Sequence, residues 1–302
     1  MRLDELARAA PFARPLAVPE WTLGCFHRRS ITYATGQEDA ATRVIWIQSH
    51  GLTGDLRIPA IRPDVHGRAR LSECTPQELT DLARAEGGVA DTGFRDGLMS
   101  WSNWAAFQPY DKWPEPGELR RVGPALIEFA PSGVYVEDWR LQPGSSGLLV
   151  GLRLVSEAPR GGAHVPRDGG LVIAGDHAIF ALARRGSLPA DAPVHRQIAA
   201  AADPHALAAR AFDAEAAYAR RDAATGDYRI VLGVDPFMEA RSLPLEGFEP
   251  AGEGGLLQRL AGVERRWRID TLRADVDLAA ATPTSAAAWL SQEADTLLAA
   301  AR

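Results

Sequence analysis

Lysine is almost absent from this 302-residue chain, because Lys112 is the only one and arginine supplies nearly all of the 33 basic residues. No arginine cluster stands out, so codon usage typical of a GC-rich genome explains the bias. Aspartate and glutamate together number 39, which gives a net charge of −6. This balance argues against nucleic-acid binding, which needs a concentrated basic surface, and against membrane-surface binding, which usually needs a basic amphipathic helix.

Cysteine and long apolar runs are also scarce. Cys25 and Cys74 are the two cysteines, too few for a disulfide scaffold, and neither belongs to a CxxC pair. No stretch approaches the ~20 apolar residues of a membrane span. Residues 1–14 include Asp4 and Glu5 and lack the apolar core of a signal peptide. We therefore expect a cytoplasmic protein, and its 46% of hydrophobic residues can bury a sizeable core.

Several catalytic and binding motifs are missing as well. The sequence has no GxSxG nucleophile motif and no GxxxxGK[ST] phosphate loop. Its seven histidines show no HxH or HExxH spacing and no His/Cys spacing typical of a metal site. We predict no cofactor and no metal ion.

The chain is instead rich in short segments of β-branched and aromatic residues, each bounded by glycine, proline or serine. This pattern predicts a mainly β protein whose antiparallel strands close into a barrel, in two barrel-like halves with a few peripheral helices. The expected strands include residues 28–33, 42–48, 125–130, 133–140, 147–155, 170–174 and 178–184.

Three segments favour helices. Thr75, Pro76 and Glu78 form a capping-box pattern that predicts a helix up to about residue 85. Alanine-rich sequence predicts helix over 193–221, and a terminal helix is expected from 284 to 301. We divide the chain into an N-terminal arm (1–20), a first β-barrel domain (21–190), and a helical connector with a second β-rich domain (191–302).

The most distinctive stretch is residues 46–59, WIQSHGLTGDLRIP. It resembles a signature of the HRI1-like proteins of fungi and bacteria, and residues 133–139 add weaker support. The resemblance covers about the first 180 residues and implies a lipocalin-like or calycin-like barrel, whereas a shared fold implies no particular function. It transfers no catalytic residues, because we associate no established catalytic set with that group.

The same stretch contains the first candidate site. Side chains alternate between the faces of a strand, so Trp46, Gln48 and His50 would share one face, and Asp55 and Arg57 would share a face with each other. Inside a barrel, His50 could be a general base, while Asp55 and Arg57 could orient a ligand. The alternative is a structural Asp55–Arg57 salt bridge with His50 at the edge of a loop.

A second candidate is the aromatic segment 100–113. Trp101, Trp104, Phe107, Tyr110 and Trp113 could line the apolar mouth of a ligand site, since aromatic walls dominate such pockets. The alternative is a plug that fills one end of the barrel as ordinary core.

A third candidate is Glu137, which shares a strand face with Tyr135 and Trp139. A glutamate buried between two aromatic rings would have a raised pKa and could act as an acid or a base. The alternative is a glutamate that faces solvent or pairs with an arginine.

Our first functional hypothesis is a barrel that binds a small apolar or aromatic molecule, with or without acid–base catalysis of the isomerase, cyclase, lyase or hydrolase type. The proposed catalytic residues are His50, Asp55, Arg57 and Glu137, and the proposed ligand-binding residues are Trp46, Gln48, Trp101, Trp104, Tyr110, Tyr135 and Trp139. The alternative is a scaffold protein with solid barrels, in which residues 197–219 would form a docking helix. Cavity volume separates the two hypotheses, and a homodimer is compatible with both.

Overall fold

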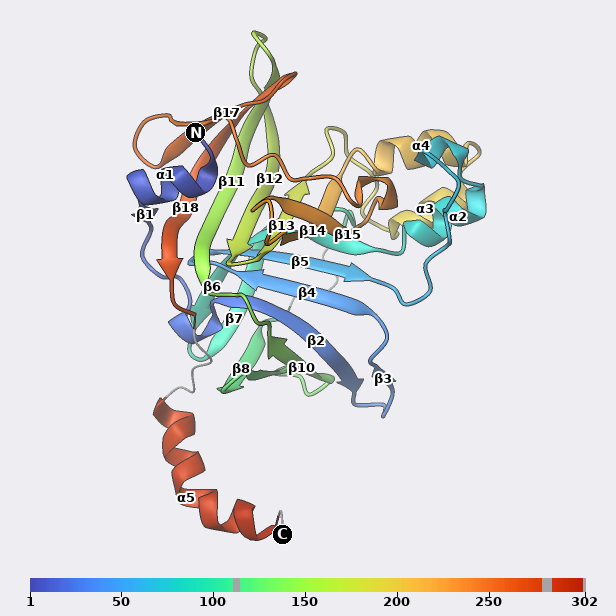
Figure 1. Ribbon diagram of the computed structural model, residues 1–302. Helices are drawn as coiled ribbons and strands as arrows, with labels where there is room; N and C mark the ends of the chain where they lie inside the picture. The colour runs from blue at the N-terminus through green and yellow to red at the C-terminus, as the bar shows by residue number, and fades with distance from the viewer. Residues whose placement is uncertain (111–114, 279–283, 301–302) are drawn as a thin grey trace.

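The chain folds into two antiparallel sheets, as seen in a computed structural model that describes residues 1–110, 115–278 and 284–300 (Figure 1). The first sheet follows the order β10-β9-β8-β7-β6-β5-β4-β2-β3. Its strands are β2 (Gly24–Tyr33), β3 (Glu38–Asp39), β4 (Arg43–Gln48), β5 (Leu52–Ile58), β6 (Glu86–Arg95), β7 (Leu98–Ala106), β8 (Gly117–Val122), β9 (Ala125–Phe129) and β10 (Tyr135–Leu141).

This first sheet closes on itself. β10 pairs with β9 on one side and with β2 on the other, so eight strands form a barrel and the short β3 lies outside it. The pairing of β2 with β10 runs from Tyr33 opposite Tyr135 to Phe26 opposite Leu141. The prediction of a mainly β chain with an antiparallel barrel is confirmed.

The second sheet follows the order β15-β14-β13-β12-β11-β18-β17-β16, with β1 added beside β18. Within the described residues no pairing joins β15 to β16, so this half remains an open sheet. Its strands are β1 (Phe12–Ala13), β11 (Gly147–Pro159), β12 (Val165–Ala174), β13 (His177–Leu182), β14 (Glu215–Arg221), β15 (Tyr228–Gly233), β16 (Phe248–Pro250), β17 (Gly255–Arg259) and β18 (Val263–Val276).

The boundary between the sheets differs from the expected division. β11, β12 and β13 lie in the second sheet rather than in the first barrel, and β1 of the N-terminal arm pairs with β18 of the same sheet. The change of sheet therefore falls at residues 142–146, not near residue 190. Strands on both sides of this short connection have similar composition, so their local pattern does not indicate which sheet they join.

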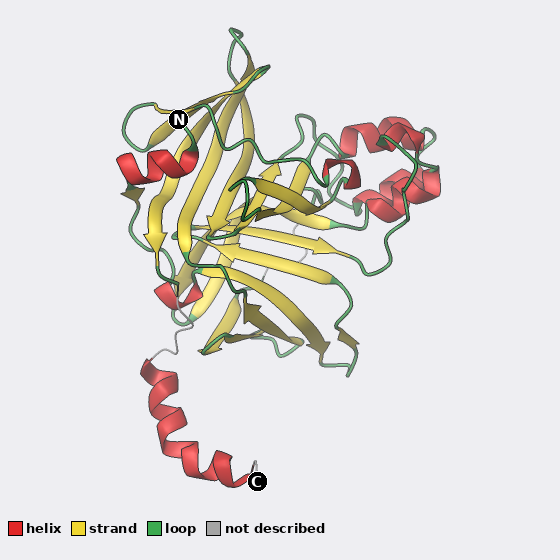
Figure 2. Cartoon of the chain, viewed as in Figure 1, coloured by secondary structure: helices red, strands yellow, loops and turns green. Residues whose placement is uncertain are grey.

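The helices lie around the sheets (Figure 2). They are α1 (Leu3–Ala9), α2 (Pro76–Leu82), α3 (Val194–Ala200), α4 (Pro204–Ala211) and α5 (Thr284–Ala300), with single turns at η1 (Glu20–Thr22), η2 (Leu71–Glu73) and η3 (Pro236–Met238). α2 begins with the predicted capping box, in which Thr75 accepts from the Glu78 amide. α2, α3 and α4 pack together. No helix in the described ranges is both long and apolar enough to cross a membrane.

The helix expected over 193–221 is wrong in its last third. α3 and α4 end by Ala211, and residues 215–221 form β14, between β13 and β15. Ala216, Ala217 and Ala219 are buried there. Alanine favours a helix locally, but burial between neighbouring strands overrides that preference. The docking helix of the scaffold hypothesis is therefore absent at these positions.

The barrel and the second sheet share one apolar core. Barrel residues such as Ile47 and Leu56 belong to the same buried cluster as Val172 and Ile179 of the second sheet. A separate cluster, containing Leu6 of α1, packs with other residues of the second sheet. The barrel is therefore fixed against the second sheet by buried apolar contacts.

Gly54 on β5 allows a close approach between the sheets. A Cβ atom at this position would lie 2.8 Å from Ile179 Cβ and 2.9 Å from its Cγ2. Gly54→Ala should therefore lower the free energy of unfolding by about 1–3 kcal/mol through overpacking, measured by urea denaturation. Gly93→Ala is the matched control, because its Cβ would meet its nearest atom, Ser100 Oγ, at 3.7 Å. Equal stabilities of the two variants would contradict this account of the interface.

A cavity inside the barrel

The barrel encloses a cavity of about 100 Å³, and its walls are formed by both aromatic and charged side chains. It is lined by side chains from β4, β5, β6, β7, β9 and β10 and by residues just after β7. The aromatic lining residues are Trp46, Trp101, Trp104, Tyr110, Tyr135 and Trp139, and the charged ones are Asp55, Arg57, Glu86, Glu128 and Glu137. The cavity thus combines a large aromatic surface with four carboxyl groups and one guanidinium.

Strand alternation explains most of this lining. On β10, Tyr135, Glu137 and Trp139 are buried and line the cavity, whereas Val136 between them is exposed. On β5, Asp55 and Arg57 point into the same space. The structure places nine of the eleven candidate residues on the cavity wall, and the exceptions are Gln48 and His50.

Trp101 and Trp104 both face the cavity because β7 contains a bulge. Val89 pairs with Ala105 and Asp91 pairs with Ser102, so two residues of β7 lie opposite one residue of β6. The extra residue is accommodated at Asn103, whose φ of 54° is left-handed and tolerated by asparagine. Regular alternation would have placed two residues three apart on opposite faces.

The other aromatic residues of segment 100–113 do not all join this wall. Tyr110 lines the cavity, but Phe107 is buried in the shared core, with its ring centroid 5.0 Å from that of Phe212. Trp113 lies outside the described residues. The segment therefore contributes both to the cavity wall and to the core.

Trp46 is at the centre of an aromatic cluster in the barrel. Its ring stacks on Phe26 with centroids 5.1 Å apart and meets Trp139 edge-on at 5.6 Å. Its indole Nε1 donates to Thr53 Oγ1 at 2.6 Å. These contacts hold the Trp46 side chain in one orientation.

Gln48 and His50 lie away from the cavity surface. Gln48 is fully buried, and its side-chain amide donates to the carbonyls of Ser49 and Leu52. His50 follows the end of β4, and its Nδ1 lies 2.9 Å from the carbonyl oxygen of Arg14. Alternation stops where β4 ends, so it does not extend to His50, and the role of general base has no geometric support there.

Glu128 and Glu137 form a pair of carboxyl groups inside the barrel. They are opposite each other on β9 and β10, and both are buried. Two carboxylates directly across neighbouring strands repel each other, which favours one proton on the pair. A Cβ at Gly117 would lie 2.8 Å from Glu128 Oε1, so the glycine leaves room for this side chain.

The surroundings determine which carboxyl group holds the proton. Arg28 donates to Glu137 at 2.6 Å, and their side chains are only 4% and 3% exposed. Glu128 instead accepts a hydrogen bond from the Tyr135 hydroxyl at 3.1 Å. Burial and the neighbouring Glu137 raise the pKa of Glu128 to about 8. Glu128 is therefore mostly protonated at neutral pH, and Glu137 is the member of the pair that is bonded to a guanidinium.

Asp55 and Arg57 form a salt bridge on the cavity wall. Arg57 Nε lies 2.8 Å from one oxygen of Asp55, and Nη2 lies 3.4 Å from the other. Burial opposes the charge of Arg57, but Asp55 and Glu137 outweigh it and raise its pKa. The salt-bridge alternative therefore describes the contact correctly, and the pair still faces the cavity.

A second cavity, of about 330 Å³, adjoins the first at the end of the barrel near α3. The two share Arg57, Glu86, Gln108 and Tyr110 as lining residues. The Gln108 side chain donates to the carbonyls of Ala83 and Ala85 and accepts from the Val194 amide. Gln108 thus connects the barrel to the chain near α2 and α3.

Glu128 is the main residue that the sequence analysis missed. Glu128 shares one face of β9 with Leu126, which is fully buried. The alternation of side chains along β9 could therefore have indicated a carboxyl group that points inward. Its importance comes from Glu137 on the next strand, a relation that the pattern of one segment does not reveal.

In comparisons with known proteins, no family model, no curated protein and no solved structure shows significant similarity to this chain. The resemblance to HRI1-like proteins stays a prediction. Functional inference therefore depends on the cavity itself.

Proposed function

We propose that the barrel binds a small, largely aromatic molecule that is neutral or positively charged, and that the Glu128–Glu137 pair contacts its polar end. The observation that carries the proposal is a single cavity with four tryptophans and four carboxyl groups on its walls. Tryptophan rings offer flat apolar surface and attract cations through their π faces.

The charges of the cavity favour this class of ligand over an anion. Arg57 is the one positively charged lining residue, and it is already bonded to Asp55. An anionic ligand would therefore compete with Asp55 for the Arg57 guanidinium and would lie close to Glu86 and Glu137, at a cost that low solvent exposure increases. A protonated Glu128 can donate a hydrogen bond to a neutral ligand, and the ionised form can pair with an ammonium group.

The same pair is suited to proton transfer. A protonated Glu128 opposite Glu137, whose carboxyl group is bonded to Arg28, provides an acid and a candidate base on neighbouring strands, with the pKa of the acid near the working pH. This arrangement supports the acid–base part of our hypothesis, with Glu128 as the acid and Glu137, in place of His50, as the base.

Three ligands of similar size but different charge test the binding proposal. Benzylamine, benzyl alcohol and benzoate should be titrated against the protein by calorimetry at pH 7. We expect benzylamine or benzyl alcohol to bind at least about tenfold more tightly than benzoate, a difference of about 1.4 kcal/mol. Tightest binding of benzoate would contradict the charge argument.

Variants locate the binding site. Trp104→Ala should weaken binding of the preferred ligand, because it removes one wall of the cavity. Trp21→Phe is the control, since Trp21 does not line the cavity.

Native mass spectrometry of the freshly purified protein, with the denatured mass beside it, would reveal a ligand already present. Absence of both a retained mass and probe binding would favour the scaffold alternative.

A further inference from the structure

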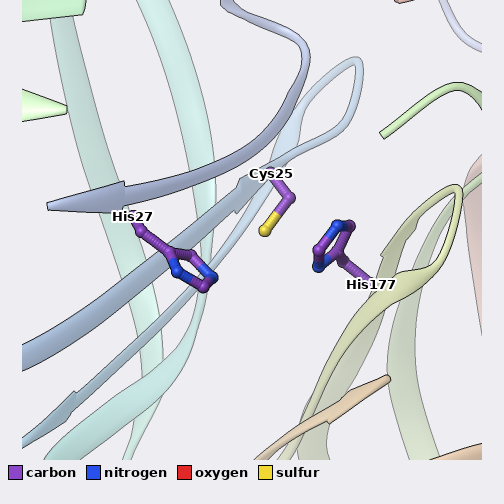
Figure 3. A group of neighbouring side chains, drawn as sticks. All are labelled: Cys25, His27 and His177. Atoms are coloured by element: carbon purple, nitrogen blue, oxygen red, sulfur yellow. The ribbon is translucent and has the colours of Figure 1, made fainter. Parts of the chain in front are cut away.

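Cys25, His27 and His177 form a cluster outside the barrel cavity (Figure 3). One potential ligand atom from each residue lies within 4.8 Å of the other two. Cys25 and His27 are on β2, and His177 begins β13, so the cluster joins the barrel to the second sheet. On β2 these residues alternate with Phe26 and Arg28, whose side chains contact Trp46 and Glu137 of the barrel interior.

We propose that Cys25, His27 and His177 bind a Zn²⁺ ion at the junction of the two sheets. One sulfur and two imidazole nitrogens are donors that suit zinc, whereas Mg²⁺ and Ca²⁺ prefer oxygen ligands. The site is independent of the barrel cavity and of the proposed ligand.

His27 is available for coordination. Its Nε2 is buried and has no hydrogen-bond partner among the described residues. In Figure 3 this edge of the ring faces Cys25 and His177. A neutral imidazole with its hydrogen on Nδ1 has its lone pair at Nε2, on the edge of the ring that faces the other two residues. A buried nitrogen without a partner is costly unless something binds it.

The hydrogen bonds of His177 are those expected of a zinc-binding histidine, in which one ring nitrogen is bonded to the protein and the other can bind the metal ion. Its Nε2 lies 2.9 Å from the Pro143 carbonyl oxygen, which can only accept, so Nε2 carries the hydrogen. Nδ1 then has the lone pair, which accepts from the Tyr218 hydroxyl at 2.6 Å. A backbone carbonyl that fixes the tautomer is a frequent second partner of zinc-bound histidine. Zinc would take the place of the Tyr218 hydrogen at Nδ1.

Binding requires small movements and the release of one proton. Zinc lies about 2.3 Å from sulfur and about 2.0–2.1 Å from nitrogen, which places its ligand atoms about 3.5 Å apart. Since the three ligand atoms already lie within 4.8 Å of one another, each pair must close by at most about 1.3 Å. The Cys25 side chain carries a thiol hydrogen at pH 7, as cysteine ordinarily does. It coordinates as the thiolate, and its proton passes to the buffer.

Titration of the intact protein with Zn²⁺ tests the proposal, with a chromophoric chelator as competitor and chelator-treated protein as the starting state. We expect one Zn²⁺ per chain, release of close to one proton at pH 7, and a higher Tm when zinc is bound. Proton release follows from the binding enthalpy in buffers of different ionisation enthalpy. Co²⁺ should give the near-ultraviolet charge-transfer band of a cobalt–thiolate bond.

His27→Asn is the decisive variant, because the Nε2 that it removes makes no hydrogen bond within the described residues. It should weaken Zn²⁺ binding at least about 100-fold, since even outer partners of zinc ligands contribute about 10–100-fold. Cys25→Ala should do the same and abolish the cobalt–thiolate band. Cys74→Ala, at the other buried cysteine, should leave both unchanged.

Two results would overturn the proposal. One is less than stoichiometric zinc at saturation of the unmodified protein. The other is equal zinc affinity in His27→Asn and Cys74→Ala, which would place the ion elsewhere. If Cys25→Ala does not fold, as judged by circular dichroism, the zinc affinity of His27→Asn still tests the proposed site. None of these results depends on ligand binding in the barrel.

Discussion

Glu128→Gln is expected to remove a pH-dependent loss of stability from this protein. The pKa of Glu128 is raised to about 8 in the folded chain by burial and by Glu137, against about 4.3 for a glutamate in an unfolded chain. Between these two values the folded state binds more protons than the unfolded state, so the free energy of unfolding falls as the pH rises. The loss is complete once the pH exceeds the folded-state pKa.

The magnitude should be large. At about 1.4 kcal/mol per pH unit, the difference between the two pKa values corresponds to roughly 5 kcal/mol. Glutamine cannot ionise, so the variant should be more stable than the unmodified protein at pH 8.5, with the two stabilities converging toward pH 5. Urea denaturation at pH 5, 6.5 and 8.5 measures this difference.

Glu118→Gln is the matched control for this experiment, because Glu118 is on the neighbouring strand β8 with a partly exposed side chain. Its stability profile should run parallel to that of the unmodified protein. A parallel profile for Glu128→Gln as well would mean that Glu128 does not hold the proton of the carboxyl pair.

Arg28→Met should be among the most destabilising single changes in the barrel. Arg28 is bonded to Glu137 at 2.6 Å with both side chains nearly inaccessible, and it also contacts Asp39 at 3.2 Å. Removal of the guanidinium leaves a buried carboxylate without its counter-charge. We expect a loss of about 3–5 kcal/mol in the free energy of unfolding, the usual result of breaking a buried ion pair on one side.

A second change distinguishes this explanation from a simple loss of packing. Arg28→Met combined with Glu137→Leu should recover most of the lost stability, because no buried charge then remains unpaired. The exposed pair of Arg120 and Glu118 is the control, and Arg120→Met should cost at most about 1 kcal/mol. If the double variant is no more stable than Arg28→Met alone, the ion pair is not the source of the effect. All four proteins can be compared by urea denaturation at pH 7.

The sequence predicted features that depend on one segment at a time. Alternation along β10 placed Tyr135, Glu137 and Trp139 on one face, and the structure puts all three in the cavity. The capping box at Thr75 and the start of the last helix at Thr284 were also predicted from local pattern. Each of these depends on contacts within a few residues.

Features that depend on distant partners escaped prediction. The proton on Glu128 depends on Glu137 across the strand pair, and Glu137 in turn depends on Arg28, 109 residues away in the sequence. Likewise, Cys25 and His27 show a Cys-x-His spacing in β2, but His177 joins them only through the fold. The spacing of two residues within one strand therefore does not reveal a site whose third residue lies on the other sheet.

Irregular geometry accounts for other differences. The bulge at Asn103 brings Trp104 to the same side as Trp101, and it is defined by the register of β6 against β7. The end of β4 removes His50 from the face shared by Trp46 and Gln48. The alanine-rich β14 shows burial overriding a helical preference. In each case the neighbouring strands, and not the local sequence, determine the conformation of the segment.

The apolar core shared by the barrel and the second sheet has a consequence for folding. Residues 142–146 look like a natural place to divide the chain, yet residues on both sides contribute to the same buried cluster. A fragment ending there would expose the apolar outer surface of β4 and β5 to water, and such exposed patches promote aggregation. We therefore expect the two sheets to unfold together in one cooperative transition, so that a closed barrel and an open sheet behave thermodynamically as one unit.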